Sequence, residues 1–447
     1  MSLNDRAPRY TFSEDGNASR LAGQAAFDRL ASVLPEETWE DVLAGEVGLG
    51  GIPGAAGTYE GTARLVHSVD DLLRLSRLSR AQLRRRPVDV SRLAAEVADT
   101  RNAFRDDISA TLKKVYNAAA VVIVPGGGTY GMEAVARQFA GGRRCLVVRN
   151  GWFSYRWSQI LETGGITADI TVLKARRIGD GPQAPFAPAP IGEVVARIAA
   201  EKPAVVFAPH VETSSGMLLP DAYVRAVADA AHAAGGLFVL DCIASGELWV
   251  DMQACGVDVL ISAPQKGWSA SPCSALVMLG ENALERIAGT TSNSFACDLR
   301  KWLEIMQAYE KGGHAYHATM PTDALRKFRD AMQETAARGF DTVRAEQIEL
   351  GRRVRALFEA KGFPSVAAAG FQAPGVVVSF TTDPDIQNGR KFLQQGLQIA
   401  AGVPLMCDEG PDYRSFRIGL FGLDKLQDIE RTVAHLAAAL EHIGAAL

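Results

Sequence analysis

Short apolar runs alternate with amphipathic stretches through the middle of the chain. The apolar runs cover residues 121–124 (VVIV), 145–148 (CLVV), 170–173 (ITVL), 204–208 (AVVFA), 237–240 (LFVL), 257–261 (VDVLI) and 274–279 (SALVML). A helix-like spacing of apolar residues recurs between them, near 129–140, 153–163, 190–201 and 221–234. Strands that alternate with helices are typical of a parallel sheet covered on both faces. The pattern therefore predicts an α/β unit with a mostly parallel, seven-stranded sheet.

The pattern changes after about residue 312. Long helical stretches at about 321–361 precede short strands at 375–380 and 415–418, and a last helix is predicted from Leu423 onward. This order is typical of a smaller α+β domain. We place a large domain at residues 61–315 and the small C-terminal domain at residues 316–447.

The residues before the first strand are harder to assign to an element. Residues 1–60 are mixed and end in a glycine-rich stretch at 47–57, which we interpret as part of the small domain or of the ligand pocket. Helices are predicted at 70–86 and 88–119. The first of them carries an arginine stripe, formed by Arg74, Arg77, Arg80, Arg84, Arg85 and Arg86. Because the chain as a whole is negative, a solvated or subunit-facing helix is favoured over a polyanion site.

Composition and charge narrow the function classes. The chain has 447 residues, 47% of them hydrophobic and 22% charged, with a formal net charge of −4. These values favour a globular protein with no general attraction to nucleic acid or to an anionic membrane. The first ten residues lack the apolar core of a secretory signal, and six cysteines show no paired metal spacing. We expect a cytoplasmic protein.

A glycine-rich turn at 125–131 (PGGGTYG) follows the first predicted strand and opens a helix. Bare backbone at Gly126 and Gly128 would let amide groups approach a phosphate at the helix N-terminus, with Thr129 as a further donor. The spacing of Gly126, Gly128 and Gly131 also matches a dinucleotide fingerprint. That alternative, a nicotinamide-dependent oxidoreductase, is disfavoured because no acid follows the next strand to bind a ribose.

Two charged residues stand at the ends of later strands. Asp241 ends one apolar run and Lys266 follows the next. Each alone is ordinary, as a capping aspartate or a surface lysine. Together with the upstream glycine turn, they form a pattern typical of proteins that hold pyridoxal phosphate: the lysine would form an imine with the aldehyde, and the acid would keep the ring nitrogen protonated.

Seven short motifs occur in the order found in one family. They are 126–129 (GGGT), 150–153 (NGWF), 210–216 (HVETSSG), 241–245 (DCIAS), 262–266 (SAPQK), 316–319 (YHAT) and 416–419 (FRIG). The set resembles the class V aminotransferases of fold type I, and is most similar to the alanine–glyoxylate and serine–pyruvate branch. The resemblance runs from about Val121 to the C-terminus. It implies a pyridoxal-phosphate enzyme.

The resemblance also implies roles for single residues around the cofactor. Gly127, Gly128 and Thr129 would form the phosphate loop, and Gln265 would also reach the phosphate. Lys266 would carry the covalent link.

Other residues would contact the cofactor ring. Phe153 would stack on it, and Ile243 would press its opposite face. Thr213 would bond near the ring hydroxyl, and Asp241 would pair with the ring nitrogen.

Three residues near the C-terminus complete the implied site. Arg417 would grip the substrate carboxylate in a bidentate fork. Tyr316 and Thr319 would reach the phosphate from a partner subunit, which implies a homodimer with shared active sites.

Two departures from the family pattern affect substrate identity. Gly127 stands where the family has serine, and Thr129 stands where it has histidine, as in 2-aminoethylphosphonate–pyruvate aminotransferases. The family's N-terminal substrate turn has no counterpart here that we can name.

Our hypothesis is an aminotransferase that moves an amino group from a small amino acid, such as alanine or serine, to a 2-oxo acid such as glyoxylate or pyruvate. A 2-aminoethylphosphonate–pyruvate transaminase or another class V enzyme (a lyase) is the alternative. A desulfurase would need a mobile cysteine loop, and Cys407 lacks the expected flanking pattern. His314 and His317 have the spacing of metal ligands on a helix, but no nearby acid or cysteine completes a metal set.

Overall fold

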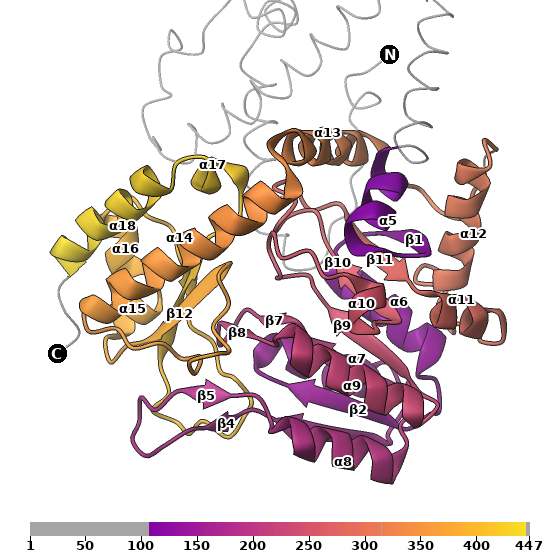
Figure 1. Cartoon of the computed structure of the whole chain (residues 1–447), viewed down its shortest axis with the longest axis horizontal. Helices are drawn as coiled ribbons and strands as arrows, with labels where there is room; N and C mark the ends of the chain where they lie inside the picture. Colours follow the sequence, from indigo (N-terminus) through magenta and orange to yellow (C-terminus); the bar gives the residue numbers. More distant parts are fainter. Residues whose placement is uncertain (1–106, 314, 444–447) are drawn as a thin grey trace, which may run out of the picture. The chain divides into compact units, whose positions relative to one another are not determined.

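A computed structural model describes residues 107–313 and 315–443 of the chain (Figure 1). All of these residues belong to one compact unit, Ala94–Leu447. The glycine-rich stretch at 47–57, the predicted arginine-striped helix at 70–86 and most of the predicted helix at 88–119 lie outside the described residues, as does His314. The division into domains at residues 60 and 315 stays a prediction.

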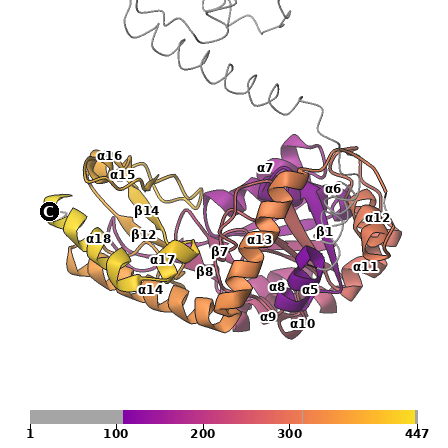
Figure 2. The same cartoon turned by 90° about the horizontal axis from the view of Figure 1, so that it is seen from above.

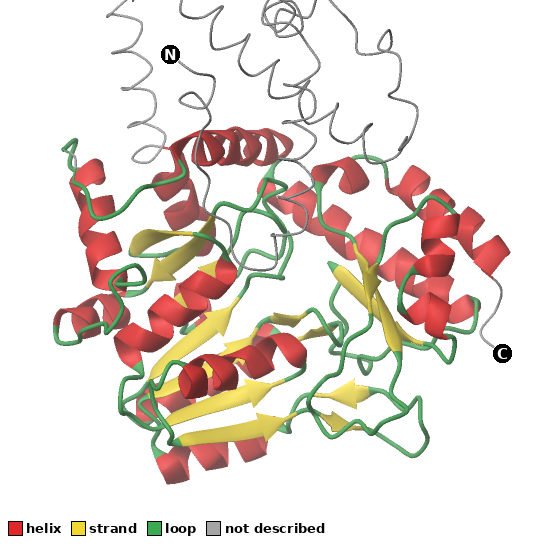
Figure 3. Ribbon diagram, turned by 180° about the vertical axis from the view of Figure 1, so that it is seen from behind, coloured by secondary structure: helices red, strands yellow, loops and turns green. Residues whose placement is uncertain are grey.

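Seven strands form one sheet in the order β1-β11-β10-β9-β6-β2-β3. Their bounds are β1 (Ala120–Pro125), β2 (Cys145–Arg149), β3 (Ile170–Lys174), β6 (Val205–Pro209), β9 (Leu237–Asp241), β10 (Val259–Ser262) and β11 (Ser274–Leu279). Neighbouring strands are parallel except where β11 pairs antiparallel with β1 and with β10. The predicted seven-stranded, mostly parallel sheet is confirmed (Figure 3).

Helices bury both faces of this sheet. Along β1, Val121 and Ile123 belong to one apolar core, and Val122 and Val124 belong to the other. The first core includes side chains of α5 (Ala110–Tyr116), α8 (Ile191–Glu201), α9 (Asp221–Ala233) and α10 (Met252–Cys255), and the second those of α6 (Gly128–Phe139), α7 (Trp152–Thr163), α11 (Glu281–Ala288) and α12 (Leu299–Glu310). Because strand side chains alternate between the faces, burial of both faces requires the nearly continuous apolar runs of the sequence.

Local pairing adds short strands outside the seven-stranded sheet. Within the proline-rich stretch at 179–190, β5 (Phe186–Ala187) pairs with β4 (Arg176–Arg177). After β6, β7 (Val211–Glu212) and β8 (Met217–Leu218) form a short antiparallel pair. Two-residue strands of this kind leave too short a pattern to be recognised in a sequence.

The C-terminal part is α+β, as predicted. A three-stranded sheet of β12 (Val376–Phe380), β14 (Ser415–Gly419) and β13 (Ala400–Ala401) packs with α14 (Phe340–Ala360) and α18 (Ile429–Ile443) (Figure 2). The shorter helices are α15 (Pro384–Gln387), α16 (Arg390–Gln394) and α17 (Leu423–Leu426). The predicted helical stretch at 321–361 is two helices, because Gly339, with φ +96°, separates α13 (Thr322–Arg338) from α14.

Gly351 lets α14 pack directly on the chain that leads into β12. A Cβ atom at Gly351 would lie 2.4 Å from the carbonyl oxygen of Pro374, whereas a Cβ at Gly192 in α8 would meet no atom within 4 Å. Gly351→Ala is therefore expected to destabilise the protein by roughly 1–3 kcal/mol, since backbone must move. Gly192→Ala is expected to stabilise it by up to about 1 kcal/mol, through helix propensity. Urea unfolding of the two variants measures both changes, and a Gly351→Ala protein as stable as the wild type would contradict this packing.

Candidate active site

The carboxyl ends of the parallel strands bring most of the predicted residues to one cavity. Its volume is about 420 Å³. The cavity is lined by Gly128, Thr129, Met132, Phe153, Arg156, Val211, Thr213, Asp241, Ile243, Ala244, Gln265, Lys266, Val376, Ala400, Arg417, Gly419 and Phe421. Ligands of open α/β sheets bind at this edge, because the loops that follow the strands meet there.

The glycine turn forms one end of the cavity. Gly126 has φ +117°, and Gly127 is the N-cap residue of α6. A Cβ at Gly128 would lie 2.5 Å from Cδ1 of Ile243, so only glycine leaves room for that side chain. The first amide groups of α6 have no partner within the helix and carry its positive dipole end. This geometry suits a phosphate group.

Asp241 ends β9 and is almost fully buried, with 7% of its surface exposed. Its carboxylate accepts a hydrogen bond from the backbone amide of Ile243 at 2.9 Å. Within the described residues, Asp241 forms no ion pair. Burial raises its pKa to about 7, against weaker lowering by that hydrogen bond. A cation placed beside Asp241 would restore its charge.

Lys266 lies in the loop after β10 and enters the same cavity. Burial, and next the positive charge of Arg417, lower the pKa of the Lys266 amine. Its Nζ atom lies 5.4 Å from the ring centre of Phe421. The preceding residue, Gln265, has a buried Oε1 atom without a hydrogen-bond partner among the described residues. Because its pKa is lowered, a larger fraction of the Lys266 amine is neutral, and so able to act as a nucleophile, than in an exposed lysine.

Arg417 enters from the C-terminal part of the chain. It sits on β14, and its Nε atom donates a hydrogen bond to the carbonyl oxygen of Ala401 at 2.8 Å. Its guanidinium carbon lies 5.6 Å from the ring centre of Phe153. Burial lowers its pKa, yet guanidinium keeps its charge at neutral pH.

Glu212 organises the cavity wall and was missed by the sequence analysis. Its side chain is fully buried and accepts hydrogen bonds from the amides of Phe153, Ser154 and Ser214 and from the hydroxyls of Ser154 and Ser214. These bonds tie the first turn of α7, which carries Phe153, to the turn that carries Thr213. The signal was present in the motif at 210–216, in which the sequence analysis assigned a role only to Thr213.

Arg156 is a second residue that the sequence analysis did not select. It lines the cavity one turn after Phe153, and its Nη1 atom donates to Oγ1 of Thr129 at 2.9 Å. Its guanidinium carbon lies 5.2 Å from the ring centre of Phe153. The guanidinium thus stands beside the glycine turn and adds positive charge where a phosphate would bind.

Three predicted residues do not line the cavity. Gly127 is the N-cap residue of α6 and directly precedes the lining residue Gly128. Tyr316 and Thr319 are exposed, and 80% of the surface of Tyr316 is accessible to solvent. Their predicted contact with the phosphate of a partner subunit stays a prediction.

The alternative chemistries find little support in the described residues. Burial raises the pKa of the Cys407 thiol to about 12, and Cys407 does not line the cavity, so it is a poor sulfur nucleophile. The ring of His317 bonds to the carbonyl of Phe295 at 2.7 Å. Among the residues that the structure describes, no group of three histidine, cysteine or acidic side chains could hold a metal ion.

Known proteins with related sequences are consistent with this geometry. A soluble hydrogenase small subunit from Synechococcus sp. is 27% identical and covers 72% of this chain and 80% of its own. A 2-aminoethylphosphonate–pyruvate transaminase from Burkholderia ambifaria is 28% identical, over 73% of this chain and 84% of its own. Alanine–glyoxylate aminotransferase 1 from Saccharomyces cerevisiae is 27% identical, over 67% of this chain and 77% of its own.

A solved structure shares the fold. Alanine–glyoxylate aminotransferase from Nostoc sp. superposes with a TM-score of 0.65 at 20% identity, over 78% of this chain and 92% of that chain. The predicted fold type I architecture is thereby confirmed. The family model for aminotransferase class-V matches residues 59–403, which include all of the cavity-lining residues except Arg417, Gly419 and Phe421. The chain belongs to the class-V aminotransferase family.

Proposed function

We propose that this protein is a pyridoxal-phosphate-dependent aminotransferase that moves the amino group of a small amino acid, such as alanine or serine, to a 2-oxo acid such as glyoxylate or pyruvate. The observation that carries the proposal is the meeting of Lys266, Asp241 and Arg417 in one cavity. These three side chains come from separate elements and provide an amine, a buried acid and a carboxylate-binding cation.

The residues present fit pyridoxal phosphate. Among the described residues, no cation pairs with the buried carboxylate of Asp241, and a protonated pyridine nitrogen would supply one. Gln265 has a buried amide oxygen with no hydrogen-bond partner in the described part of the chain, and the bare backbone of Gly128 faces the glycine-turn end of the cavity. Arg156 adds a cation beside Thr129, where the phosphate would bind.

When bound, the cofactor supplies an aldehyde that condenses with amines and a cationic ring that withdraws electrons from the bond being broken. The remaining tasks fall to side chains of this chain. Arg417 would bind the substrate carboxylate and so orient its Cα–H bond. Lys266, with its lowered pKa, would take up and return the Cα proton. Asp241 would hold a proton on the ring nitrogen.

Positioning of the ring would depend on the residues around it. Phe153 offers an aromatic face and Thr213 a hydroxyl, and Glu212 connects the two segments that carry them. Ile243 lies against the glycine turn at Gly128. The hydrogen bonds of Glu212 would thus hold the segments that carry Phe153 and Thr213 in place beside the ring.

Thr129 and the relatives named above keep one alternative open, a 2-aminoethylphosphonate–pyruvate transaminase. A phosphonate carries more charge than a carboxylate, and the cavity has two guanidinium groups, on Arg156 and Arg417. The two functions differ only in the amino donor.

The homodimer also belongs to this proposal. Large apolar or aromatic side chains are exposed at Tyr130 (55%), Phe295 (76%) and Tyr316 (80%), and Tyr130 follows the glycine turn directly. The exposure of Tyr130 next to the glycine turn, and of Tyr316, supports a partner subunit that covers these side chains. We further propose a cytoplasmic location, since all six cysteines are buried and free. No helix in the described ranges is long and apolar enough to cross a membrane.

Lys266→Ala is expected to abolish the borohydride-reducible linkage between protein and pyridoxal phosphate. It should also lower turnover by about 10²–10⁴-fold, the usual contribution of a positioned proton carrier. Mass spectrometry after reduction measures the linkage. Lys311→Ala, which removes an exposed lysine after α12, should keep the linkage and turnover unchanged. A reduced adduct that persists in the Lys266→Ala protein would show that another residue carries the cofactor.

Without cofactor, the thermal stability of the wild type is expected to fall relative to Asp241→Asn as pH rises from about 4 to about 7. Burial raises the pKa of Asp241 to about 7, so the folded protein retains a proton that the unfolded chain has already released. That contribution to stability is complete at low pH and is lost as pH passes through the folded pKa. Scanning calorimetry of both cofactor-free proteins at several pH values measures the difference. If the difference in thermal stability between the two proteins does not change with pH, the pKa of Asp241 is not raised by burial.

The amino donor can be identified by adding alanine, serine or 2-aminoethylphosphonate separately and following the visible absorbance of the bound cofactor. The main proposal expects a response to alanine or serine, and the alternative expects one to 2-aminoethylphosphonate alone. Arg417→Lys should raise the KM for the responding donor by roughly tenfold or more, since lysine cannot form the bidentate fork. Arg414→Lys, at an exposed residue outside the cavity, is the matched control. An unchanged KM in Arg417→Lys would remove Arg417 from the substrate site.

A further inference from the structure

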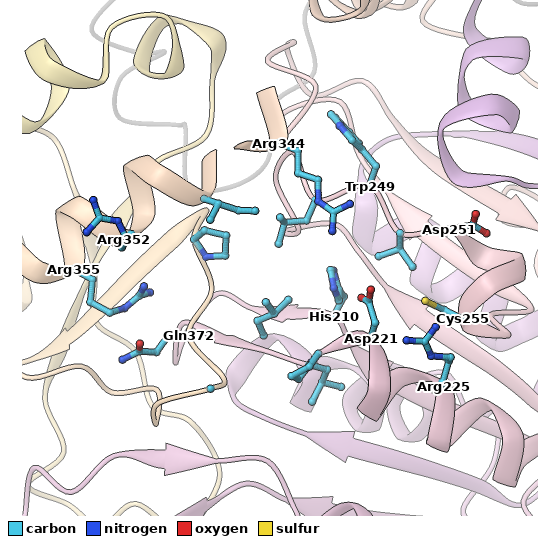
Figure 4. Close-up of a pocket in the computed structure, with 18 of the residues that line it drawn as sticks. His210, Asp221, Arg225, Trp249, Asp251, Cys255, Arg344, Arg352, Arg355 and Gln372 are labelled. Atoms are coloured by element: carbon cyan, nitrogen blue, oxygen red, sulfur yellow. The ribbon is translucent and has the colours of Figure 1, made fainter. Parts of the chain in front are cut away.

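A second cavity, of about 690 Å³, lies apart from the candidate active site (Figure 4). None of its lining residues lines the first cavity. One wall is built from the segments after β6 and β9 and from the start of α9, and includes His210, Asp221 and Trp249. The opposite wall is built from α14 and from the segment that precedes β12. Its size is in the range of sites for small organic ligands.

One face of α14 supplies most of the positive charge of this cavity. Arg344, Ile348, Arg352 and Arg355 all line it, at a spacing that places them along one side of a helix. Arg352 is paired with Glu349. Arg344 has no hydrogen bond or ion pair with any residue that the structure describes, and Figure 4 shows its guanidinium group directed toward His210.

Arg355 is the more buried of these cations. One of its terminal nitrogens donates to the carbonyl oxygen of Ala373 at 2.6 Å, but its Nε atom is buried with no partner among the described residues. Burial lowers its pKa to about 10, because the charged guanidinium is removed from water. A desolvated guanidinium with an unfilled donor is unfavourable unless an acceptor binds to it.

The acidic residues of the cavity do not neutralise this face. Asp251 is already bonded to the side chain of Asn117 and caps α10 through the amide of Ala254. Asp221 stands on the opposite wall with Arg225, one helical turn along α9. Glu359 is near Arg355 and raises its pKa, without a hydrogen bond to it.

His210 and the apolar lining define the rest of the cavity. Burial lowers the pKa of His210 to about 4, so its ring is neutral at physiological pH and bonds to Ser245 at 2.7 Å. Leu218 and Trp249 line the same space, and Ile348 is 47% exposed although it faces a cavity. An uncharged, partly apolar body would be accommodated there.

We propose that this cavity binds a small organic anion, whose carboxylate or phosphate groups pair with the guanidinium groups along this face, those of Arg344 and Arg355, and whose less polar body packs on Trp249 and Ile348. The planar guanidinium groups match the oxygen atoms of either anion. A ligand in this place touches both the strand-end segments of the seven-stranded sheet and α14. It would therefore stabilise the two parts of the chain in one arrangement.

Titration calorimetry of the cofactor-loaded enzyme tests the site with two probes, citrate for carboxylates and adenosine monophosphate for phosphate esters. Saturable binding of at least one probe is expected, and the probe that binds identifies the anion. In the double variant Arg344→Gln, Arg355→Gln, its affinity should fall about tenfold or more, because charge-assisted hydrogen bonds are lost. Arg353→Gln is the matched control: it is on the same helix but pairs with Glu430 and does not line the cavity.

Two results would overturn the proposal. One is the absence of saturable binding by either probe, and the other is equal affinity in the wild type and the double variant, which would place binding elsewhere. Retained cofactor absorbance shows that the double variant is folded. If it does not fold, Arg344→Gln alone gives the same comparison, since that exposed side chain has no partner to lose among the described residues. The assay measures binding directly, so its outcome does not depend on the proposed amino donor.

Discussion

A buried carboxylate that finds no counter-ion among the described residues is the constraint around which this site is built. Asp241 ends a central strand, and covering both faces of the sheet removes it from water. Burial raises its pKa to about 7, because the charged form is unfavourable in this environment. The fold gives Asp241 one hydrogen bond, from the amide of Ile243, but no described residue forms an ion pair that would compensate its charge. A cationic ring nitrogen does, and this requirement links the fold to its cofactor.

Glu212 is a second buried carboxylate, but its charge is stabilised within the protein. It is also fully buried, yet five hydrogen-bond donors from the start of α7 and from the turn after β7 surround its carboxylate. The N-terminal end of α7 adds a favourable dipole. Glu212 is thus satisfied within the protein and works as a structural connection, whereas Asp241 is left available to a ligand. Both carboxylates are buried, so burial does not distinguish the structural role of Glu212 from the ligand-binding role of Asp241. The number of hydrogen bonds that each carboxylate accepts does.

The cations of the site come from distant parts of the chain. Lys266 follows β10 of the large sheet, and Arg417 lies on β14 of the small one, paired in register with Val378 of β12. The proximity of Arg417 helps to lower the pKa of Lys266. The geometry between the two sheets therefore tunes the amine as well as placing the carboxylate-binding group. The same α14 that packs on the segment before β12 also presents the arginine face of the second cavity.

The sequence by itself determined the strands, the main helices and nine of the seventeen residues that line the cavity. Burial of both sheet faces demands long apolar runs, and the phosphate turn, the acid and the lysine each follow such a run, so local pattern and order along the chain were sufficient. Only the tertiary structure decided that β11 runs antiparallel between β1 and β10, that Glu212 and Arg156 belong to the cavity wall, and that α14 faces a second cavity with its arginines. Strand pairing and side-chain partners are set by contacts between residues far apart in the chain, and the periodicity of one segment does not encode which other segment it will meet.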